Sequence, residues 1–541
     1  MLKKIALKTS NDKGMALVAT LVMVLTISAI AIAMLSMTSN DIKLSSLQEA
    51  SKETFYIAEA GLERAIAYLE ELGNPAFTAP KNPFEDENGG SPILGDGRYQ
   101  VEITWEPPLS YYVTSKGIMP WNNTTGQINT TIESKVILDN FAMFAYFSDI
   151  EIFPSDIDAG YGGKEIWFQS GDRIEGKLHS NDRLNMAGTP TFYGAVTSSY
   201  KNPATGDTSW KAYDKSTKPN FLGTPPYQGG VDRIELPTFR NITEPSDSRS
   251  LQRIAAGSKE FIDSHSGSHQ KGVYLPNNGN SVTNGIWIKG DVKQINFGTE
   301  LGNSKIFIDQ SNITNKETTI YTITEGNTIN LGGTFYNSGT VVEERNTNTN
   351  VRTYTHYNDK TNGVIFVDGE VKSLQGNATD GGVKGTYTLA SNYDINITGN
   401  ILYNTRVNNP DCFDVEDGYP DIPDTLGLVT EKNIKIPKKD IFNNIVPNNI
   451  EINAIMMALG TSFYFQGFKD DIKDTLTVYG SFIQKQRGPV GTFSSNKRTG
   501  YNKDYHFDTR MNVNNPKFGE VLPPYFPTTG KYVKLWWKEV D

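Results

Sequence analysis

The chain has 541 residues, of which 37% are hydrophobic, and it carries a net charge of −10 with a pI near 5.3. This acidic balance argues against a nucleic-acid-binding surface, and the single cysteine, Cys412, excludes an internal disulfide framework and zinc sites of the Cys-x-x-Cys type. The length allows more than one domain or one extended repeat structure.

An uncharged apolar segment runs from Met15 to Met37, and its 23 residues exceed the ~20 that a helix needs to cross a bilayer. Residues 1–14 before it carry four lysines against one acid, Asp12, which favours a cytoplasmic location for that end. We therefore expect a single-pass protein of the cytoplasmic (inner) membrane whose carboxyl-terminal part lies outside the cytoplasm. A plain uncleaved anchor and a signal peptide cut near Ala33 are the two alternatives.

The junction Lys13-Gly14-Met15, a charged leader that ends in Gly before a long apolar helix, resembles type IV pilins and the pseudopilins of type II secretion. The segment Glu53–Leu72 resembles the amino-terminal helix of PilX-type minor pilins. The resemblance implies that a prepilin peptidase cuts after Gly14 and methylates Met15. It also implies other pilins, an inner-membrane assembly platform and membrane lipid as partners, and incorporation into a surface pilus.

The chain departs from the pilin pattern at Ala19, the fifth position counted from Met15, where pilins usually carry Glu. In the family, that carboxylate is thought to meet the terminal amine of a subunit already in the filament, because a charge in hydrocarbon is less costly when paired. The resemblance, taken together with this departure, implies a subunit that is placed first, at the filament tip, and not a subunit of the shaft.

Beyond Met37 the pattern is helical to Leu72 and is followed by the stop signal Gly73-Asn74-Pro75. An apolar stripe, which either docks on a soluble head or packs in a filament, comprises Phe55, Ala58, Leu62, Ala65, Leu69 and Leu72. A helix over 15–72, membrane-spanning at 15–37 and amphipathic at 38–72, would be about 87 Å long. Residues 73–97 read as a linker.

Residues 98–541 alternate as short strands, with one helix expected near 248–263, so the fold class is mainly β with a long N-terminal helix. A template (apolar, any, apolar, any, Gly, any, apolar) starts at residues 286, 365, 395 and 476. These spacings are near multiples of ~27 residues, which favours a β-helix or solenoid-like head whose gaps hold further coils. A β-sandwich is the alternative.

A second resemblance lies in Glu165–Ser199, which is similar to the core motif of an uncharacterised domain attached to PilX-type amino termini. Segments 476–493 and 500–511 resemble later blocks of that domain. This resemblance implies a pilus-related role and no particular chemical reaction.

Several polar clusters contain residue types that could form a site, and in each a structural role is favoured. His179, Asn181 and Asp182 fit a strand-turn corner, and His265 with His269 fits a loop. Asp504, His506, Asp508 and Arg510 alternate as if on one strand face, where a salt-bridged corner is expected. The weak calcium candidates are Asp411, Asp414, Glu416 and Asp417, with Asp421 and Asp424 nearby. Of Trp536 and Trp537, one should be buried.

Nucleophile elbows, phosphate loops and dinucleotide fingerprints are missing from the sequence. We therefore expect no enzyme, no cofactor and no bound metal, but a minor-pilin-like structural component of type IV pilus or type II secretion-like assembly. The alternative is a membrane-anchored β-solenoid that binds or cleaves a surface polysaccharide.

Overall fold

The computed structural model describes residues 12–73, 75, 77–85, 90–106, 109–121, 126–238, 240–267, 271–310, 319–331, 333–414, 420–494, 497–512, 515 and 518–540. The chain forms two compact units. Unit 1 comprises Met1–Ile137 with Tyr532–Asp541, and unit 2 comprises Leu138–Lys531. The mainly β architecture with one long amino-terminal helix is confirmed.

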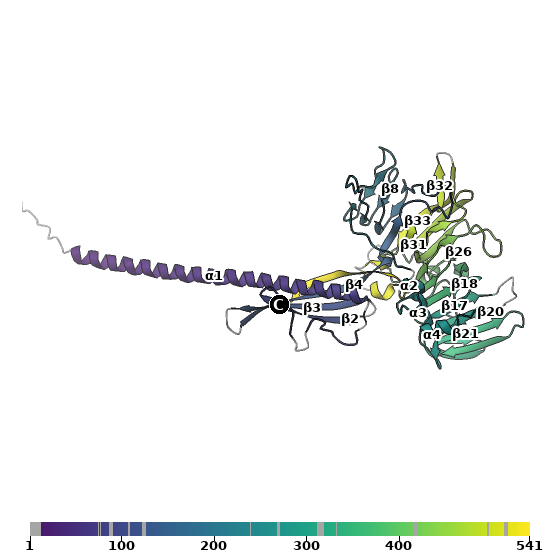
Figure 1. Cartoon of the computed structure of the whole chain (residues 1–541), viewed down its shortest axis with the longest axis horizontal. Helices are drawn as coiled ribbons and strands as arrows, with labels where there is room; N and C mark the ends of the chain where they lie inside the picture. The colour runs from purple at the N-terminus through teal and green to yellow at the C-terminus, as the bar shows by residue number, and fades with distance from the viewer. Residues whose placement is uncertain are drawn as a thin grey trace, which may run out of the picture. The chain divides into compact units, whose positions relative to one another are not determined.

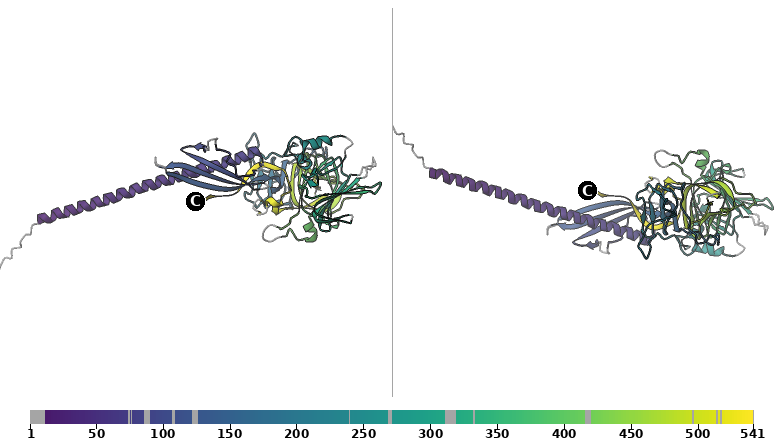
Figure 2. Two further views of the ribbon diagram at one scale, coloured as in Figure 1. Left: turned by 90° about the horizontal axis from the view of Figure 1, so that it is seen from below. Right: turned by 90° about the horizontal axis from the view of Figure 1, so that it is seen from above.

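Unit 1 combines the helix α1 (Asp12–Leu72) with a five-stranded sheet, in which α1 packs on strands β2 and β3 (Figures 1 and 2). The sheet order is β1 (Ile93–Leu94), β2 (Gly97–Glu106), β3 (Ser110–Trp121), β4 (Gly126–Asn140) and β34 (Thr528–Val540). β1 to β4 are joined as antiparallel neighbours. The last strand of the chain therefore completes the sheet on which its first helix lies.

The apolar stripe of α1 docks on this sheet, which is one of the two roles expected for it. Ala58, Leu62, Ala65 and Leu69 are at most 2% exposed, whereas Leu72 is 44% exposed. The helix comes so close that a Cβ atom at Gly117 of β3 would lie 2.0 Å from the carbonyl oxygen of Thr54. Close backbone approach is thus one reason for glycine in this strand.

Unit 2 contains a long ladder of strands that pair in parallel. Its order is β17 (Ile286–Lys289), β23 (Val364–Asp368), β25 (Thr386–Ser391), β27 (Thr425–Thr430), β29 (Ile450–Ala458), β31 (Ile472–Gln486), β5 (Phe144–Ile150), β7 (Lys177–Ser180), β10 (Val196–Ser198) and β13 (Gln228–Gly229). The chain thus enters the ladder in its middle, beside β31, and its early strands extend one end.

A second parallel ladder accompanies the first. It comprises β18 (Gln294–Glu300), β24 (Val371–Gly376), β26 (Ile395–Ile401), β28 (Ile434–Ile436) and β30 (Phe463–Phe465). Because consecutive strands alternate between the two ladders from β23 to β30, each pair of strands stacks on the next. Parallel pairing of this kind is more typical of the predicted solenoid-like head than of the alternative, a sandwich of Greek-key hairpins.

The strongest template copies lie side by side. Ile286 pairs with Ile365, and Lys289 with Asp368, so the two motifs stack in register. The gap between 395 and 476 does hold further stacked strands, β27 to β30. The gap between 286 and 365 was expected to hold coils as well. Its first strand, β18, does stack in parallel on β24, but the strands after it pair antiparallel, namely β19 (Asn303–Asp309), β20 (Thr319–Leu331), β21 (Thr334–Asn346) and β22 (Arg352–Tyr357).

Smaller elements flank the ladders. They are β6 (Arg173–Ile174), β9 (Thr191–Phe192) and β12 (Asn220–Phe221) in one parallel sheet, β8 (Asn185–Met186) with β11 (Lys211–Ala212), β14 (Gly272–Tyr274), β15 (Asn277–Asn278) with β16 (Ser281–Val282), β32 (Gly491–Ser494), β33 (Lys497–Phe507), α2 (Arg240–Thr243), α5 (Asn404–Asn408), α6 (Phe518–Val521), η1 (Phe141–Met143), η2 (Ala378–Asp380) and η3 (Thr509–Met511). The helix expected near 248–263 is two helices, α3 (Leu251–Ala256) and α4 (Lys259–Ser264), because Gly257 between them has φ of 79°.

One hydrophobic core follows the ladders of unit 2 from Tyr146 and Leu178 through Ile365, Leu428 and Val478. These residues are at most 5% exposed. Burial of this continuous apolar interior and the ladder hydrogen bonds stabilise a chain that has no disulfide. The packing of this core holds in place the strands that line a cavity described below.

Candidate functional site

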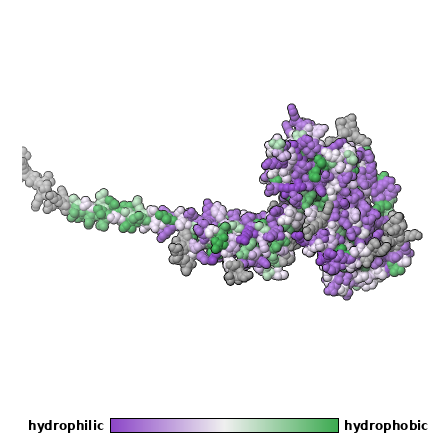
Figure 3. All heavy atoms as spheres, viewed as in Figure 1, coloured by the Kyte–Doolittle hydropathy of each residue, from purple (hydrophilic) through white to green (hydrophobic). Residues whose placement is uncertain are grey.

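The first part of α1 is an apolar surface that the described part of the chain leaves uncovered. Every side chain from Met15 to Glu49 is exposed, and Ala50 is the first buried one. Figure 3 shows hydrophobic residues gathered over this part of the helix. The hydroxyls of Thr20 and Thr26 donate to carbonyl oxygens of their own helix turn, which satisfies them without water. Exposed apolar surface of this extent marks a contact with lipid or with other apolar helices.

The described part of α1 from Met15 to Leu72 has the length and composition of a membrane-crossing helix, and none of its apolar segment is buried. A single amino-terminal apolar helix of this kind is compatible with a membrane anchor. Gly14 lies within α1, Met15 is 74% exposed, and Ala19 is exposed. The predicted leader 1–14 falls outside the described residues up to residue 11, and its cleavage stays a prediction.

A second candidate is a cavity of about 420 Å³ in unit 2, between β31 and β33 on one side and the segment 168–175 on the other. Aromatic rings form much of its wall, namely Tyr146, Phe168, Phe463, Phe482 and Tyr505. The rings of Phe482 and Tyr505 lie 4.5 Å apart between centroids, and those of Phe463 and Phe482 lie 5.1 Å apart. The volume, and a wall that combines aromatic rings with polar and charged side chains, are those of small-molecule sites.

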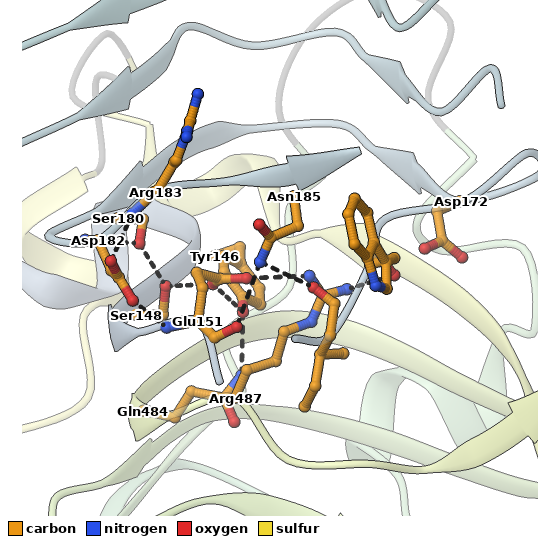
Figure 4. A network of polar contacts seen from close by, with 12 residues as sticks. Tyr146, Ser148, Glu151, Asp172, Ser180, Asp182, Arg183, Asn185, Gln484 and Arg487 are labelled. Carbon is orange, nitrogen blue, oxygen red and sulfur yellow. Dashed lines mark hydrogen bonds and ion pairs between the residues drawn. The ribbon is translucent and has the colours of Figure 1, made fainter. Parts of the chain in front are cut away.

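A buried ion pair, Glu151 with Arg487, underlies this cavity (Figure 4). The Arg487 Nη1 and the Glu151 Oε2 are 3.0 Å apart, and the side chains are 5% and 1% exposed. Glu151 also accepts hydrogen bonds from the hydroxyls of Tyr146 and Ser148. Although burial works against its charged form, Tyr146 and Glu151 raise the pKa of Arg487, so its guanidinium stays protonated.

Arg487 fixes the aromatic wall as well. Its guanidinium carbon lies 3.7 Å from the ring centroid of Phe168, and its second terminal nitrogen donates to the carbonyl oxygen of Trp167. On the other side, the Oε1 of Gln484 accepts from the backbone nitrogens of Phe463 and Gly488. The wall is therefore held by hydrogen bonds before any ligand arrives.

Charged groups line the outer part of the cavity. His506 lies between Glu175, at 3.5 Å, and Asp504, at 2.9 Å. The hydrogen bond with Glu175 is the main cause that raises the pKa of His506, and the same bond lowers the pKa of Glu175. Lys503 lies 3.5 Å from Asp172. Charges of both signs are thus paired with each other along the opening.

The LHSND corner is structural, as favoured from the sequence. His179 is 1% exposed, its Nε2 lies 3.0 Å from the Oδ1 of Asn181, and burial lowers its pKa to about 4. Asn181 donates to Asp149 and to the carbonyl oxygen of Ile234. Asp182 accepts from the backbone nitrogens of Glu151 and Arg183. All three predicted residues are therefore engaged in holding loops.

The alternating set near residue 504 is only partly on one strand. β33 ends at Phe507, so Asp504 and His506 lie on it, whereas Asp508 and Arg510 lie beyond it and are fully buried. The Arg510 Nε donates to Asp508 at 2.9 Å, and its Nη1 donates to the carbonyl oxygen of Asp424. The expectation of one shared face was wrong, but the expected salt-bridged corner is present at this pair.

The expectation that one of Trp536 and Trp537 is buried was also wrong, since they are 38% and 52% exposed. The reason is that β34 forms the last strand of its sheet. Each indole still has an aromatic neighbour, Tyr112 for Trp536 at 6.1 Å and Phe55 for Trp537 at 5.9 Å between centroids.

The calcium and histidine candidates are not brought together. Asp411 and Asp414 are exposed, while Glu416 and Asp417 lie outside the described residues. Asp424 accepts from the backbone nitrogens of Gly385 and Thr405. Within the described ranges, three or more His, Cys, Asp or Glu side chains are nowhere close enough to hold a metal ion. His265 stacks on Phe261, and His269 lies outside the described residues.

Comparisons with known proteins give a match for part of the chain. A family model described as "Domain of unknown function (DUF4900)" matches residues 107–200. That range includes Glu165–Ser199, but it is less than half of the chain and does not assign the chain to a family. No curated protein matches the chain.

Among solved structures, the crystal structure of the competence-associated pilin ComZ from Thermus thermophilus is similar at 14% identity. The alignment covers 91% of this chain and 97% of that chain, with a TM-score of 0.30. A TM-score this low does not demonstrate a shared fold.

Proposed function

We propose that this chain is a minor-pilin-like structural subunit that takes part in assembly of a type IV pilus or a type II secretion-like filament. The observation that carries the proposal is α1. It is one 61-residue helix whose first part is apolar and uncovered and whose last part is docked on its own sheet. Such a helix has one end built for an apolar environment and the other built to hold a folded unit.

The uncovered part suits both a bilayer and a helical fibre core. In lipid, a continuous helix satisfies its own backbone groups, and the segment Met15–Met37 has no charged side chain to bury. In a fibre, the same surface would pack against the equivalent helices of other subunits, so transfer from lipid to fibre exchanges one apolar contact for another. Cleavage at the pilin-type junction after Gly14 would make this transfer possible, because it would remove the charged leader.

Ala19 supports a place at the filament tip. A subunit without a carboxylate at this position still offers its terminal amine to the next subunit, but it offers no partner for an amine already buried in a fibre. The size of the β-rich part, which occupies most of the 541 residues, also favours a single terminal place over repetition along a shaft. We propose a structural role and no catalytic one.

Mass spectrometry of the mature amino terminus in the native host tests the proposal. N-methylated Met15 is expected, and a Gly14→Leu variant should keep its leader and fail to enter filaments, whereas Lys13→Arg, which keeps the charge, should be processed normally. Recovery of a mature chain that begins at Met1 or at Met34 would overturn the proposal.

Deletion and localisation test the tip assignment. Loss of the gene should reduce the number of filaments or the amount secreted, and gold-labelled antibody against unit 2 should mark filament ends. Unchanged filament number and secretion in the deletion strain, or labelling along the whole shaft, would contradict this part of the proposal.

A further inference from the structure

We propose that the cavity beside Arg487 binds a short neutral saccharide. This inference rests on the side chains of unit 2 and is independent of the filament role. At about 420 Å³, the cavity lies within the range of ~300–1,000 Å³ that small-molecule sites occupy. Its lining combines flat apolar rings with several hydrogen-bonding groups, which is the combination that a sugar ring, apolar on its faces and polar around its edge, requires.

The rings offer an ordered stacking surface. Phe482 is 5% exposed and lies between Phe463 and Tyr505. Phe168 is held from one side by the guanidinium of Arg487. Because these rings are fixed by their neighbours, a ligand that stacks on them orders few side chains on binding, which favours affinity for a small ligand.

Hydrogen-bonding capacity remains unused in the cavity wall. Tyr505 lines the cavity, burial raises its pKa, and its hydroxyl has no hydrogen-bond partner among the described residues. The carboxylates of Asp172, Glu175 and Asp504 can each accept further hydrogen bonds, since each carboxylate has about four acceptor positions. Donors on a ligand are therefore met by carboxylates, and an acceptor on a ligand is met by the Tyr505 hydroxyl.

Other classes of ligand fit less well. An organic cation would meet the positive charges of Arg173, Arg487 and Lys503, which line the same cavity. An anion would meet the three carboxylates of Asp172, Glu175 and Asp504. A purely apolar ligand would strip water from those carboxylates without replacing its hydrogen bonds. A neutral, hydroxyl-rich ligand avoids all three penalties.

The test is isothermal titration calorimetry on the full chain in a detergent that has no sugar headgroup. The probes are maltose, cellobiose, lactose and N,N′-diacetylchitobiose, each taken above ~1 mM because single small sites often bind sugars weakly. At least one probe should bind with saturation. Glucuronate and choline serve as the anionic and cationic comparisons and should bind more weakly or not at all.

Tyr505→Phe removes only the unpartnered hydroxyl and should leave folding intact. It should raise the Kd about threefold to tenfold, the effect of one net hydrogen bond. Tyr464→Phe is the matched control, because Tyr464 is also half-buried but does not line the cavity, and it should leave the Kd unchanged. Asp172→Asn provides a second variant and should also weaken binding.

The proposal is overturned if none of the four disaccharides binds, or if glucuronate or choline binds more tightly than they do. Binding that is equal in wild type, Tyr505→Phe and Asp172→Asn would also overturn it, because the sugar would then bind elsewhere.

Discussion

Replacing Glu151 by Gln should destabilise unit 2 by about 3–5 kcal/mol. The substitution keeps the shape of the side chain but removes the charge that faces Arg487, whose side chain is 5% exposed. Among the described residues, the remaining acceptor of Arg487 would be the neutral carbonyl oxygen of Trp167, at 3.4 Å. The hydroxyls of Tyr146 and Ser148 would also lose a charged acceptor, which is worth more than a neutral one.

A double-mutant cycle separates the pair from its surroundings. Arg487→Met leaves a buried carboxylate and should be destabilising as well, whereas the combination Glu151→Gln with Arg487→Met removes both charges. We therefore expect the double variant to be more stable than the sum of the single losses predicts, by about 2 kcal/mol or more. This coupling is the part of the effect that belongs to the ion pair itself.

Amide hydrogen exchange read by mass spectrometry is the assay, because peptides from β5 and β31 report on unit 2 separately from unit 1. Asp470→Asn is the control, since it breaks the solvent-exposed pair of Asp470 with Lys438 and should change little. Additive losses in the double variant, or a loss below ~1 kcal/mol for Glu151→Gln, would refute the reasoning.

Three further predictions concern other parts of the chain. Because burial lowers the pKa of His179 to about 4 while an unfolded histidine titrates near 6.5, its contribution to stability is complete above pH 6.5 and falls by about 3 kcal/mol towards pH 4. His179→Gln should flatten this part of the profile in urea denaturation, and identical profiles would contradict the argument. Gly117→Ala should speed amide exchange in residues 50–72, since its Cβ would clash with the Thr54 carbonyl; Gly376→Ala, with a nearest neighbour at 3.4 Å, should not. Cys412 is 8% exposed and burial raises its thiol pKa, so iodoacetamide should modify it slowly in native protein and rapidly in urea, and equal rates would argue against burial.

The long helix, its docked stripe and the stacking of the first two template copies were accessible from the sequence because each depends on a local period. Ile286 and Ile365 share a motif and share a register. Where a break in the backbone or the position of a strand in its sheet overrode the period, the prediction was wrong. Gly257 splits the helix expected near 248–263, and the edge position of β34 leaves both Trp536 and Trp537 exposed.

The cavity was not predictable in the same way. Glu151 and Arg487 are 336 residues apart, and Tyr146 meets Phe482 only because β5 pairs with β31. No local spacing connects these residues, although Asp504 and His506 were singled out as an alternating polar pair. A signal that links distant positions, such as covariation between residues 151 and 487, is what would be needed to find the site from sequences.

The place of β5 in the ladder bears on when the protein can fold. Strand β5 has as its ladder neighbour β31, which is synthesised more than 300 residues later, and β7, β10 and β13 extend the ladder from β5. The sheet under α1 likewise waits for β34. The ladder of unit 2 therefore cannot be completed before β31 has been synthesised, and loss of the short carboxyl-terminal segment that forms β34 would remove one strand from the sheet of unit 1.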